Sequence, residues 1–204
     1  MSKHTWNYST LGIPDEMFER ADKVPITKEE VRTIQISKAR LSTGDTVFDV
    51  GCGSGSVGIE AALQIGDIGK VYCIDHDPNA IQLTKKNLEH FGVNNCTVIH
   101  AEAEDEIPNL PNANAIIIGG TGGSTGKIIK LCEKKLVENG RIVIATILIE
   151  TLFEVLSIID KSGFTNIDIT QITISKSRKT TTGTMMLARN PVTVISATYT
   201  KKST

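Results

Sequence analysis

The fold of this chain is decided by residues 47–58, which read VFDVGCGSGSVG. A short apolar run ends there in a cluster of glycines, and an apolar segment follows at 59–65. This order is typical of a buried parallel strand, a tight turn and a helix. Glycines let the backbone approach a ligand closely, and the helix start offers that ligand free N–H groups. The stretch therefore predicts a nucleotide-like cofactor bound at a Rossmann-type sheet.

The glycine spacing leaves two kinds of cofactor open. Residues 53–58 satisfy the spacing of the dinucleotide fingerprint, with Asp75 at about the right distance downstream for a ribose hydroxyl. Asp49, however, precedes a run in which glycine occupies every second position from 51 to 55. In that form the stretch resembles motif I of the class I S-adenosylmethionine-dependent methyltransferases. The resemblance favours S-adenosyl-L-methionine as the cofactor.

Length and charge restrict the class of protein. The 204 residues suit one α/β domain, which we divide into an N-terminal arm at 1–26 and a single methyltransferase domain at 27–204. The net charge of −1 gives no basic field for nucleic acid or a membrane surface. We find no apolar run long enough for a membrane span and no signal-peptide pattern, so we expect a cytoplasmic protein. The cysteines are too widely spaced to suggest a metal site or a disulfide framework.

Strand and helix patterns alternate along most of the chain. Strands are expected at 46–50, 71–75, 97–101, 115–118 and 141–149, with helices between them and at 150–162. Two later strands, at 167–174 and 184–187, should pair as an antiparallel hairpin because no helix pattern separates them. A phase slip between Ile169 and Ile172 suggests a bulge, and Pro191 should break the final strand. We therefore expect an α/β fold, a doubly wound and mostly parallel seven-stranded sheet with an antiparallel C-terminal strand, as in class I methyltransferases.

Candidate binding residues follow the strands at the carboxyl edge of the predicted sheet, where ligands of such folds bind. Asp75 ends the second strand, where its carboxylate can accept hydrogen bonds from both ribose hydroxyls. Glu102 and Ala103 follow the third strand, and Glu102 is either a partner for an adenine amino group or a surface charge. Thr27 begins the segment TKEE at 27–30, which predicts a capping box at a helix start.

The turn after the fourth strand indicates the substrate class. It reads GGTGG at 119–123 and lacks the aromatic residue that methyltransferases acting on nitrogen commonly carry there. Backbone N–H groups in such a turn favour anions. Lys176, Arg178 and Lys179 are expected in a loop at the same edge. A ligand bearing carboxylates or phosphates therefore fits better than a nucleobase, although solvated surface charge is an equally open interpretation of the basic loop.

Six segments narrow the resemblance to one family. They are GIPD at 12–15, TKEEVR at 27–32, DVGCG at 49–53, GGTGG at 119–123, ILIET at 147–151 and GTMMLARNPV at 183–192. Together they resemble the decarboxylating cobalt-precorrin-6B carbon-15 methyltransferases of anaerobic cobalamin synthesis. The resemblance implies methyl transfer to ring carbon 15 of a tetrapyrrole and loss of carbon dioxide from its ring C acetate. It also implies a homotetramer.

The same resemblance carries cofactor contacts over to individual residues. With Glu102 added from its place after the third strand, the cofactor-binding candidates are Thr27, Gly51, Cys52, Gly53, Ser54, Gly55, Asp75, Glu102 and Ala103. The substrate-binding candidates are Gly120, Thr121, Gly122, Lys176, Arg178 and Arg189, and no metal is expected.

The expected chemistry requires little from a strong base, because a carbon conjugated through a macrocycle is already nucleophilic. Positioning and electrostatics should then supply most of the catalysis. Glu150, expected at the end of the fifth strand, is the one carboxylate placed to act as a base, and helix capping is its equal alternative. Three other interpretations stay open: a methyltransferase for another small anionic substrate, a nicotinamide-dependent oxidoreductase, and a cofactor-binding protein without catalytic activity.

Overall fold

The computed structural model describes residues 6–201. Its strands are β1 (Thr46–Val50), β2 (Lys70–Asp75), β3 (Cys96–His100), β4 (Ala113–Ile118), β5 (Leu136–Thr146), β6 (Phe164–Ile172), β7 (Ser175–Lys179), β8 (Thr184–Ala188) and β9 (Val192–Tyr199). Its helices are α1 (Glu29–Ala39), α2 (Ser56–Ile65), α3 (Pro78–Phe91), α4 (Ala103–Glu106), α5 (Thr125–Lys135) and α6 (Ile149–Ile159), with short 3-10 helices η1 (Asp15–Met17) and η2 (Ile107–Asn109).

The main sheet has seven strands in the order β3-β2-β1-β4-β5-β9-β6. Strands β1 to β5 are parallel, and β9 lies antiparallel between β5 and β6. This confirms the predicted fold class, the strand number and the antiparallel C-terminal strand. The switch in strand order between β1 and β4 leaves a crevice at the carboxyl edge of the sheet, where a ligand can bind.

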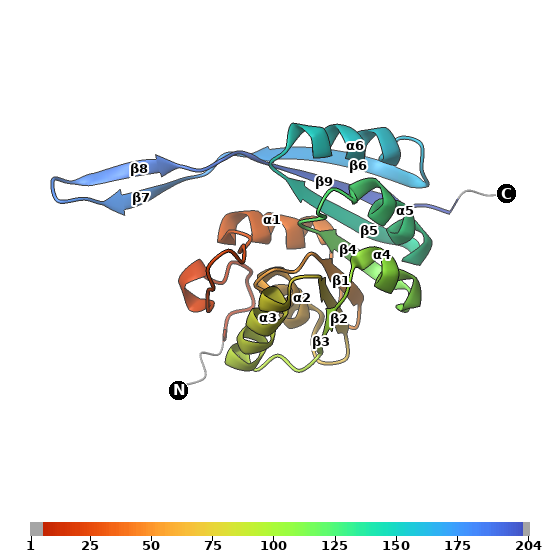
Figure 1. Ribbon diagram of the computed structural model, residues 1–204, viewed down its shortest axis with the longest axis horizontal. Coiled ribbons are helices and arrows are strands. Elements are labelled where there is room, and N and C mark those ends of the chain that lie inside the picture. Colours follow the sequence, from red (N-terminus) through yellow and green to blue (C-terminus); the bar gives the residue numbers. More distant parts are fainter. Residues whose placement is uncertain (1–5, 202–204) are drawn as a thin grey trace.

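Both faces of the sheet are covered by helices (Figure 1). Helices α1 and α2 pack on one face against β1 side chains such as Val47, and α3 covers the same side over β2 and β3. Helices α5 and α6 pack on the other face against Phe48 and Val50. Buried on both faces, the parallel strands consist of nearly continuous apolar residues, as the sequence pattern of 47–50 indicated.

The antiparallel end of the sheet differs from the predicted hairpin. Strand β6 pairs with β9 and not with the segment 184–187. The irregularity in β6 lies between Thr165 and Asp168, earlier than the predicted bulge at Ile169, and Asn166 there has a positive φ of 49°. The pattern of apolar side chains gave the strand but not its partner, because β9 lies more than twenty residues further along the chain.

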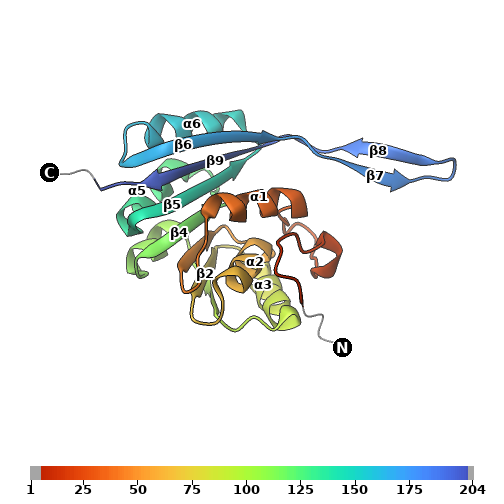
Figure 2. The ribbon, with the colours of Figure 1, turned by 180° about the vertical axis from the view of Figure 1, so that it is seen from behind.

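Strands β7 and β8 form a separate two-stranded arm that extends away from the sheet (Figures 1 and 2). Lys176, Arg178 and Lys179 therefore lie in a strand, which corrects the prediction of a loop. Pro191 lies between β8 and β9, so the predicted break is confirmed. The arm leaves the sheet at the carboxyl end of β6, which is the edge where we expected these basic residues.

Two features predicted at the ends of elements, the end of the fifth strand and the cap of the first helix, were wrong. Strand β5 ends at Thr146, and Ile149 begins helix α6 instead of ending the strand. Helix α1 begins after Lys28, whose side chain does not cap it, so the capping box at 27–30 does not form. The carboxylate of Asp15 instead accepts a hydrogen bond from the Glu29 backbone N–H at 2.9 Å.

No helix in the described part of the chain is both long and apolar enough to cross a membrane. The division into an arm at 1–26 and a domain at 27–204 stays a prediction, and its first five and last three residues lie outside the described range.

Candidate active site

The glycine turn after β1 has the backbone geometry that its sequence predicts. Gly51, Gly53 and Gly55 have φ values of 72°, 55° and 76°, a region that side chains strongly disfavour. The buried Asp49 carboxylate joins the strand to helix α2 by accepting a hydrogen bond from Gly58 N–H at 2.8 Å. Burial raises the pKa of Asp49 to about 7. The Asp49 carboxylate thus fixes the turn on the side of the sheet interior, and the opposite side of the turn faces the carboxyl edge of the sheet.

Asp75 is held beside this turn at the end of β2. Its Oδ2 accepts a hydrogen bond from Gly53 N–H at 2.9 Å, and its Oδ1 accepts one from Asp77 N–H at 2.9 Å. Only 10% of its side chain is exposed. Each carboxylate oxygen retains a second acceptor position, so the pair can still receive two ligand hydroxyls. Asp75 shares a narrow cavity with residues that follow β1, β3 and β4, namely Gly51, Glu102, Ala103, Gly120 and Thr121.

A larger cavity of about 620 Å³ opens beside the first one. The glycine turns after β1 and β4 form its floor, where a Cβ on Gly51 would lie 2.1 Å from the Gly120 carbonyl oxygen. Its walls come from the segment before α1, from α1 itself, and from the β5–α6 connection. Its lining residues are Pro25, Ile26, Thr27, Lys28, Val31, Gln35, Gly51, Cys52, Gly53, Gly119, Gly120, Thr121, Gly122, Gly123, Ala145, Thr146, Ile147, Leu148, Thr151 and Val192.

A buried ionic network positions the segment that covers the glycine turn. Arg32 on α1 is fully buried, and its Nε donates to Glu60 Oε1 on α2 at 2.6 Å. Its Nη1 lies 3.4 Å from Asp15 Oδ1 and also donates to the Thr27 carbonyl at 2.5 Å. The Pro25 carbonyl in turn accepts a hydrogen bond from Ser54 N–H at 3.2 Å. The network therefore fixes Thr27 above the turn through the backbone and not through helix capping.

The structure brings most of the predicted binding residues into these two cavities. Thr27, Gly51, Cys52, Gly53, Gly120, Thr121 and Gly122 line the larger one, and Asp75, Glu102 and Ala103 line the narrower one. Ser54 is an exception, because it lines neither cavity and its side chain faces a different pocket. Gly55 is the N-cap residue of α2 and supports the turn from outside the cavities.

Three predicted substrate-binding cations lie elsewhere. Lys176 Nζ lies 2.6 Å from Glu30 Oε1 and 3.2 Å from Glu29 Oε2. The hydrogen bond to Glu30 raises the pKa of Lys176. Arg189 lies 3.8 Å from Asp15 Oδ2, and Arg178 is exposed on the arm. Lys176 thus already has two carboxylate partners, whereas within the described chain Arg189 has only this long ionic contact and its buried Nη1 has no hydrogen-bond partner. The sequence did not reveal these contacts, because the residues are remote in the chain.

No carboxylate side chain is among the residues that line the larger cavity in the described part of the chain. Glu150 lies in the first turn of α6, is exposed, and is not a lining residue, although its neighbour Thr151 is one. The described residues also contain no group of three or more His, Cys, Asp and Glu side chains that could hold a metal ion. The cavity therefore offers hydroxyls, an amide, backbone N–H groups and one cationic residue, Lys28.

Sequence reasoning missed Gln35 on helix α1. Its side chain is 1% exposed and lines the larger cavity, and its Oε1 has no hydrogen-bond partner. A buried amide oxygen without a partner costs about 1–3 kcal/mol. Such an atom in a cavity wall indicates that a ligand supplies the missing donor. No sequence signal identified Gln35, because it occupies an ordinary position on an amphipathic helix.

The larger cavity and the Asp75 carboxylate beside it fit S-adenosyl-L-methionine. Asp75 has free acceptor positions for ribose hydroxyls, and added Cβ atoms on Gly120, Gly122 and Gly123 would meet only open space. The narrow cavity beside Ala103 has a volume of only about 20 Å³, so an adenine ring enters there only if the residues that line it move apart. The larger cavity has room for an amino-acid chain together with part of a substrate.

Comparisons with known proteins agree with this geometry. Residues 16–199 match the family of the precorrin methyltransferase domain. This chain belongs to the precorrin methyltransferase family. It is 45% identical over 193 residues to the probable cobalt-precorrin-6B C(15)-methyltransferase (decarboxylating) of Saccharolobus solfataricus, with 94% of this chain and 97% of that relative covered. The predicted family and the prediction of a methyltransferase enzyme are confirmed.

Solved structures of the family have the same fold. The precorrin-8w decarboxylase of Methanobacterium thermoautotrophicum is 36% identical, with a TM-score of 0.86 over 91% of this chain and 98% of that one. The precorrin-6Y C5,15-methyltransferase of Geobacter metallireducens is 31% identical, with a TM-score of 0.86 over 92% of this chain and 97% of that one.

Proposed function

We propose that this enzyme transfers a methyl group from S-adenosyl-L-methionine to carbon 15 of cobalt-precorrin-6B and removes the ring C acetate carboxyl group as carbon dioxide, in cobalamin biosynthesis. The observation that carries the proposal is the cavity where the two glycine turns meet, next to the Asp75 carboxylate. Relatives across nearly the whole chain have this activity in their names.

The chain's own residues would act mainly by positioning. The Asp75 carboxylate would accept hydrogen bonds from the ribose hydroxyls. The adenine would lie at the narrow cavity between Glu102 and Thr121, whose lining residues would move apart to admit the ring. S-adenosyl-L-methionine supplies an electrophilic methyl group when it is bound. Thr27 would contact the cofactor, and the N–H groups of the β4 turn would orient the substrate and its carboxylates.

The cavity composition suits a reaction without a strong protein base. Its described lining contains no carboxylate, so no side chain there is placed to remove a proton from a poorly acidic carbon. The conjugated macrocycle supplies the nucleophilic carbon and accepts the electron pair that decarboxylation releases. Gln35 Oε1, which lacks a donor in the wall, is suited to receive a substrate N–H group.

Product mass analysis tests the proposal. The purified enzyme is incubated under anaerobic conditions with cobalt-precorrin-6B and a methyl donor labelled in its methyl group. We expect a product that has gained the labelled methyl group and lost one carbon dioxide. Methylation without loss of carbon dioxide, or no labelled product, contradicts the proposal. Calorimetry with S-adenosylhomocysteine and NAD separates a methyltransferase from a nicotinamide-dependent enzyme.

We further propose that the enzyme is a homotetramer. Support comes from apolar side chains that no part of the described chain covers: Met185, Met186 and Leu187 on the arm are 47%, 63% and 46% exposed, and Phe153 on α6 is 74% exposed. We expect sedimentation equilibrium to give the mass of four chains and Met186→Lys to lower it. A monomer for the wild type contradicts this proposal. A cytoplasmic location and the absence of nucleic-acid and membrane partners stay predictions.

A further inference from the structure

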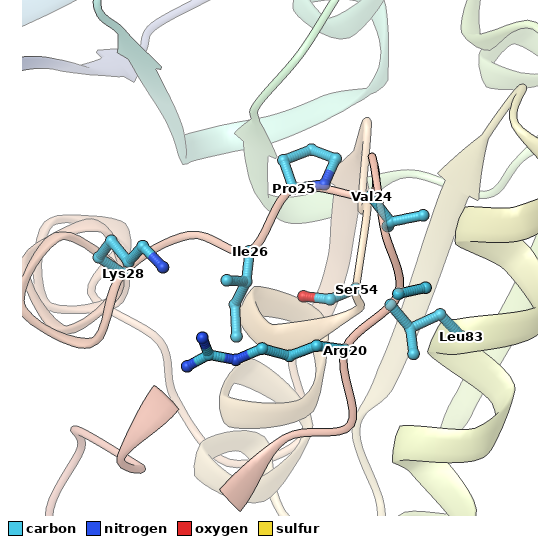
Figure 3. A pocket seen from close by; sticks show the side chains of 8 residues that line it. Arg20, Val24, Pro25, Ile26, Lys28, Ser54 and Leu83 are labelled. Carbon is cyan, nitrogen blue, oxygen red and sulfur yellow. The ribbon is translucent and has the colours of Figure 1, made fainter. Parts of the chain in front are cut away.

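A third pocket, of about 400 Å³, adjoins the candidate active site. Pro25, Ile26 and Lys28 line both the pocket and the larger cavity, so the segment before α1 forms a wall of each. The remaining lining comes from Arg20, Ala21, Val24, Ser54 and Leu83 (Figure 3). Apart from the shared wall, no described residue of this pocket lines either of the two cavities described above, so the cofactor site gives this pocket no role.

The Ser54 hydroxyl is the first sign of a ligand. Ser54 is 1% exposed, and its Oγ has no hydrogen-bond partner. Its backbone is fixed on both sides, because its N–H donates to the Pro25 carbonyl at 3.2 Å and its carbonyl accepts from Asn87 Nδ2 at 2.9 Å. The hydroxyl therefore cannot move away with its backbone, and Figure 3 shows its oxygen pointing toward the side where Arg20 and Lys28 lie.

Two cations line the same pocket, and they define the sign of the ligand. Arg20 is exposed and has no ion pair among the described residues. Lys28 Nζ lies 3.6 Å from Asp15 Oδ2, a long contact that leaves donors available. No acidic side chain lines the pocket within the described chain. A hydroxyl donor with two cations is a set of groups that binds an anion.

The walls indicate what carries the anion. The pocket also has apolar walls, formed by Val24, Ile26 and Leu83. A small inorganic ion such as phosphate would make no favourable contact with these walls. A carboxylate at the end of a short hydrocarbon chain satisfies both parts, because its methylene groups meet the apolar walls and its oxygens meet Ser54 and Arg20.

We propose that this pocket binds a carboxylate arm, an acetate or propionate side chain, of the tetrapyrrole substrate. This inference rests on the proposed function, and it follows from the shared wall, since a macrocycle seated at the larger cavity has arms around its rim that can reach past Pro25. The pocket then helps to select which edge of the ring faces the methyl donor. Free carboxylates and the carboxylate of the cofactor are the other sources of the same chemistry.

Substitutions at the pocket separate these sources. Arg20→Ala removes the unpaired cation, Ser54→Ala removes the buried hydroxyl, and Lys85→Ala is the matched control because Lys85 is exposed on α3 and does not line the pocket. For each variant we measure KM for cobalt-precorrin-6B, and by calorimetry the Kd of S-adenosylhomocysteine and of glutarate. Fluorescence quenching gives the Kd of uroporphyrin, a tetrapyrrole with acetate and propionate arms.

We expect Arg20→Ala and Ser54→Ala to raise KM and the uroporphyrin Kd about three- to fivefold, the range of an exposed charge contact for Arg20 and of one hydrogen bond for Ser54. Lys85→Ala and the S-adenosylhomocysteine Kd should not change. The proposal is overturned if Arg20→Ala behaves like Lys85→Ala. It is also overturned if S-adenosylhomocysteine binding weakens equally, which assigns the pocket to the cofactor, or if only glutarate binding is lost. Uroporphyrin binding reports on the pocket even if the enzyme fails to methylate cobalt-precorrin-6B.

Discussion

The segment around the glycine turn and the β7–β8 arm differ in how far their side chains are buried and paired within the chain. Around the turn, Asp15, Arg32 and Glu60 form a buried network whose charges are paired within the chain. On the arm, both strands are almost entirely exposed, and the apolar Met186 is 63% exposed. The ion pairs of the first region are complete within one chain. The second region exposes apolar side chains that no described residue covers, which is typical of a surface that binds another molecule.

We infer from this difference that the buried network positions the cofactor-binding segment, whereas the arm contributes outside the cofactor site. The arm is joined to the cofactor region by two ionic contacts, from Lys176 to Glu30 and from Arg189 to Asp15. Asp15 therefore belongs to both regions, since it also holds Arg32 and the start of α1. A substitution in the buried network should lower the free energy of unfolding. A substitution on the arm should instead change the proposed assembly or the affinity for substrate.

Breaking the buried network should have the largest effect. Arg32→Met removes the cation and leaves the Glu60 carboxylate buried without its charge partner. Asp15 keeps its longer ionic contacts with Lys28 and Arg189. Removal of one partner of a buried pair costs about 3–5 kcal/mol. We expect the free energy of unfolding in urea to fall by that amount, together with loss of S-adenosylhomocysteine binding because the Thr27 segment is released.

Lys38→Ala on the same helix is the matched control for Arg32→Met. Lys38 pairs with Asp168 at 2.5 Å, but 32% of its side chain is exposed. Exposed pairs contribute about 0–1 kcal/mol. If the two variants lose similar stability, the contrast between a self-contained cofactor region and an open arm is wrong.

The packing of the two glycine turns gives a second test. Gly51 has a φ of 72°, and a Cβ there would lie 2.1 Å from the Gly120 carbonyl oxygen. Gly51→Ala should lower the free energy of unfolding by about 1–3 kcal/mol and abolish S-adenosylhomocysteine binding in calorimetry. Gly120→Ala is the control, because a Cβ there meets only open space. Equal stability of the two variants would mean that the turns can separate without cost.

The cofactor half of the fold could be predicted because its signals are local. Residues 47–58 contain the strand, the turn and the helix start in one segment, and Asp77 caps α3 by accepting from Asn79 N–H at 2.9 Å, as the Asp-Pro pair indicates. Asp75 follows its strand directly. Each prediction there needed only neighbours in sequence and the rule for parallel sheets.

The rest depends on contacts between distant residues. Thr27 has the sequence of a helix cap, yet the N–H group at the start of α1 is taken by Asp15 from an earlier turn. Lys176 has the appearance of a solvated charge, yet Glu29 and Glu30 bind it from far along the chain. Gln35 became a site candidate only because the fold buries its amide without a partner. No periodicity or spacing encodes such pairings.

Asp75→Ala should have an intermediate effect, confined to binding. The variant loses charge-assisted hydrogen bonds to ribose, so we expect S-adenosylhomocysteine binding to weaken by about 1.5–3 kcal/mol in calorimetry. The fold should persist, because Asp75 ends its strand and bonds only to backbone N–H groups nearby. Asp67→Ala on an exposed turn is the control for loss of one carboxylate. An unchanged Kd for Asp75→Ala removes this residue from the site.

The smallest effect is expected from the cations of the arm. Arg178 and Lys179 are exposed, whereas Lys176 is bound by Glu29 and Glu30. If the free cations attract a polycarboxylate, Arg178→Ala with Lys179→Ala should raise the substrate KM several-fold at low salt, at about 0.2–1 kcal/mol for each charge. The effect should fade near 0.1 M salt, where the interaction between exposed charges more than about 10 Å apart is largely screened. Lys176→Ala should change KM less, because its charge is already neutralised. An equal KM for the double variant and the wild type at every salt concentration would limit the arm to contacts between chains.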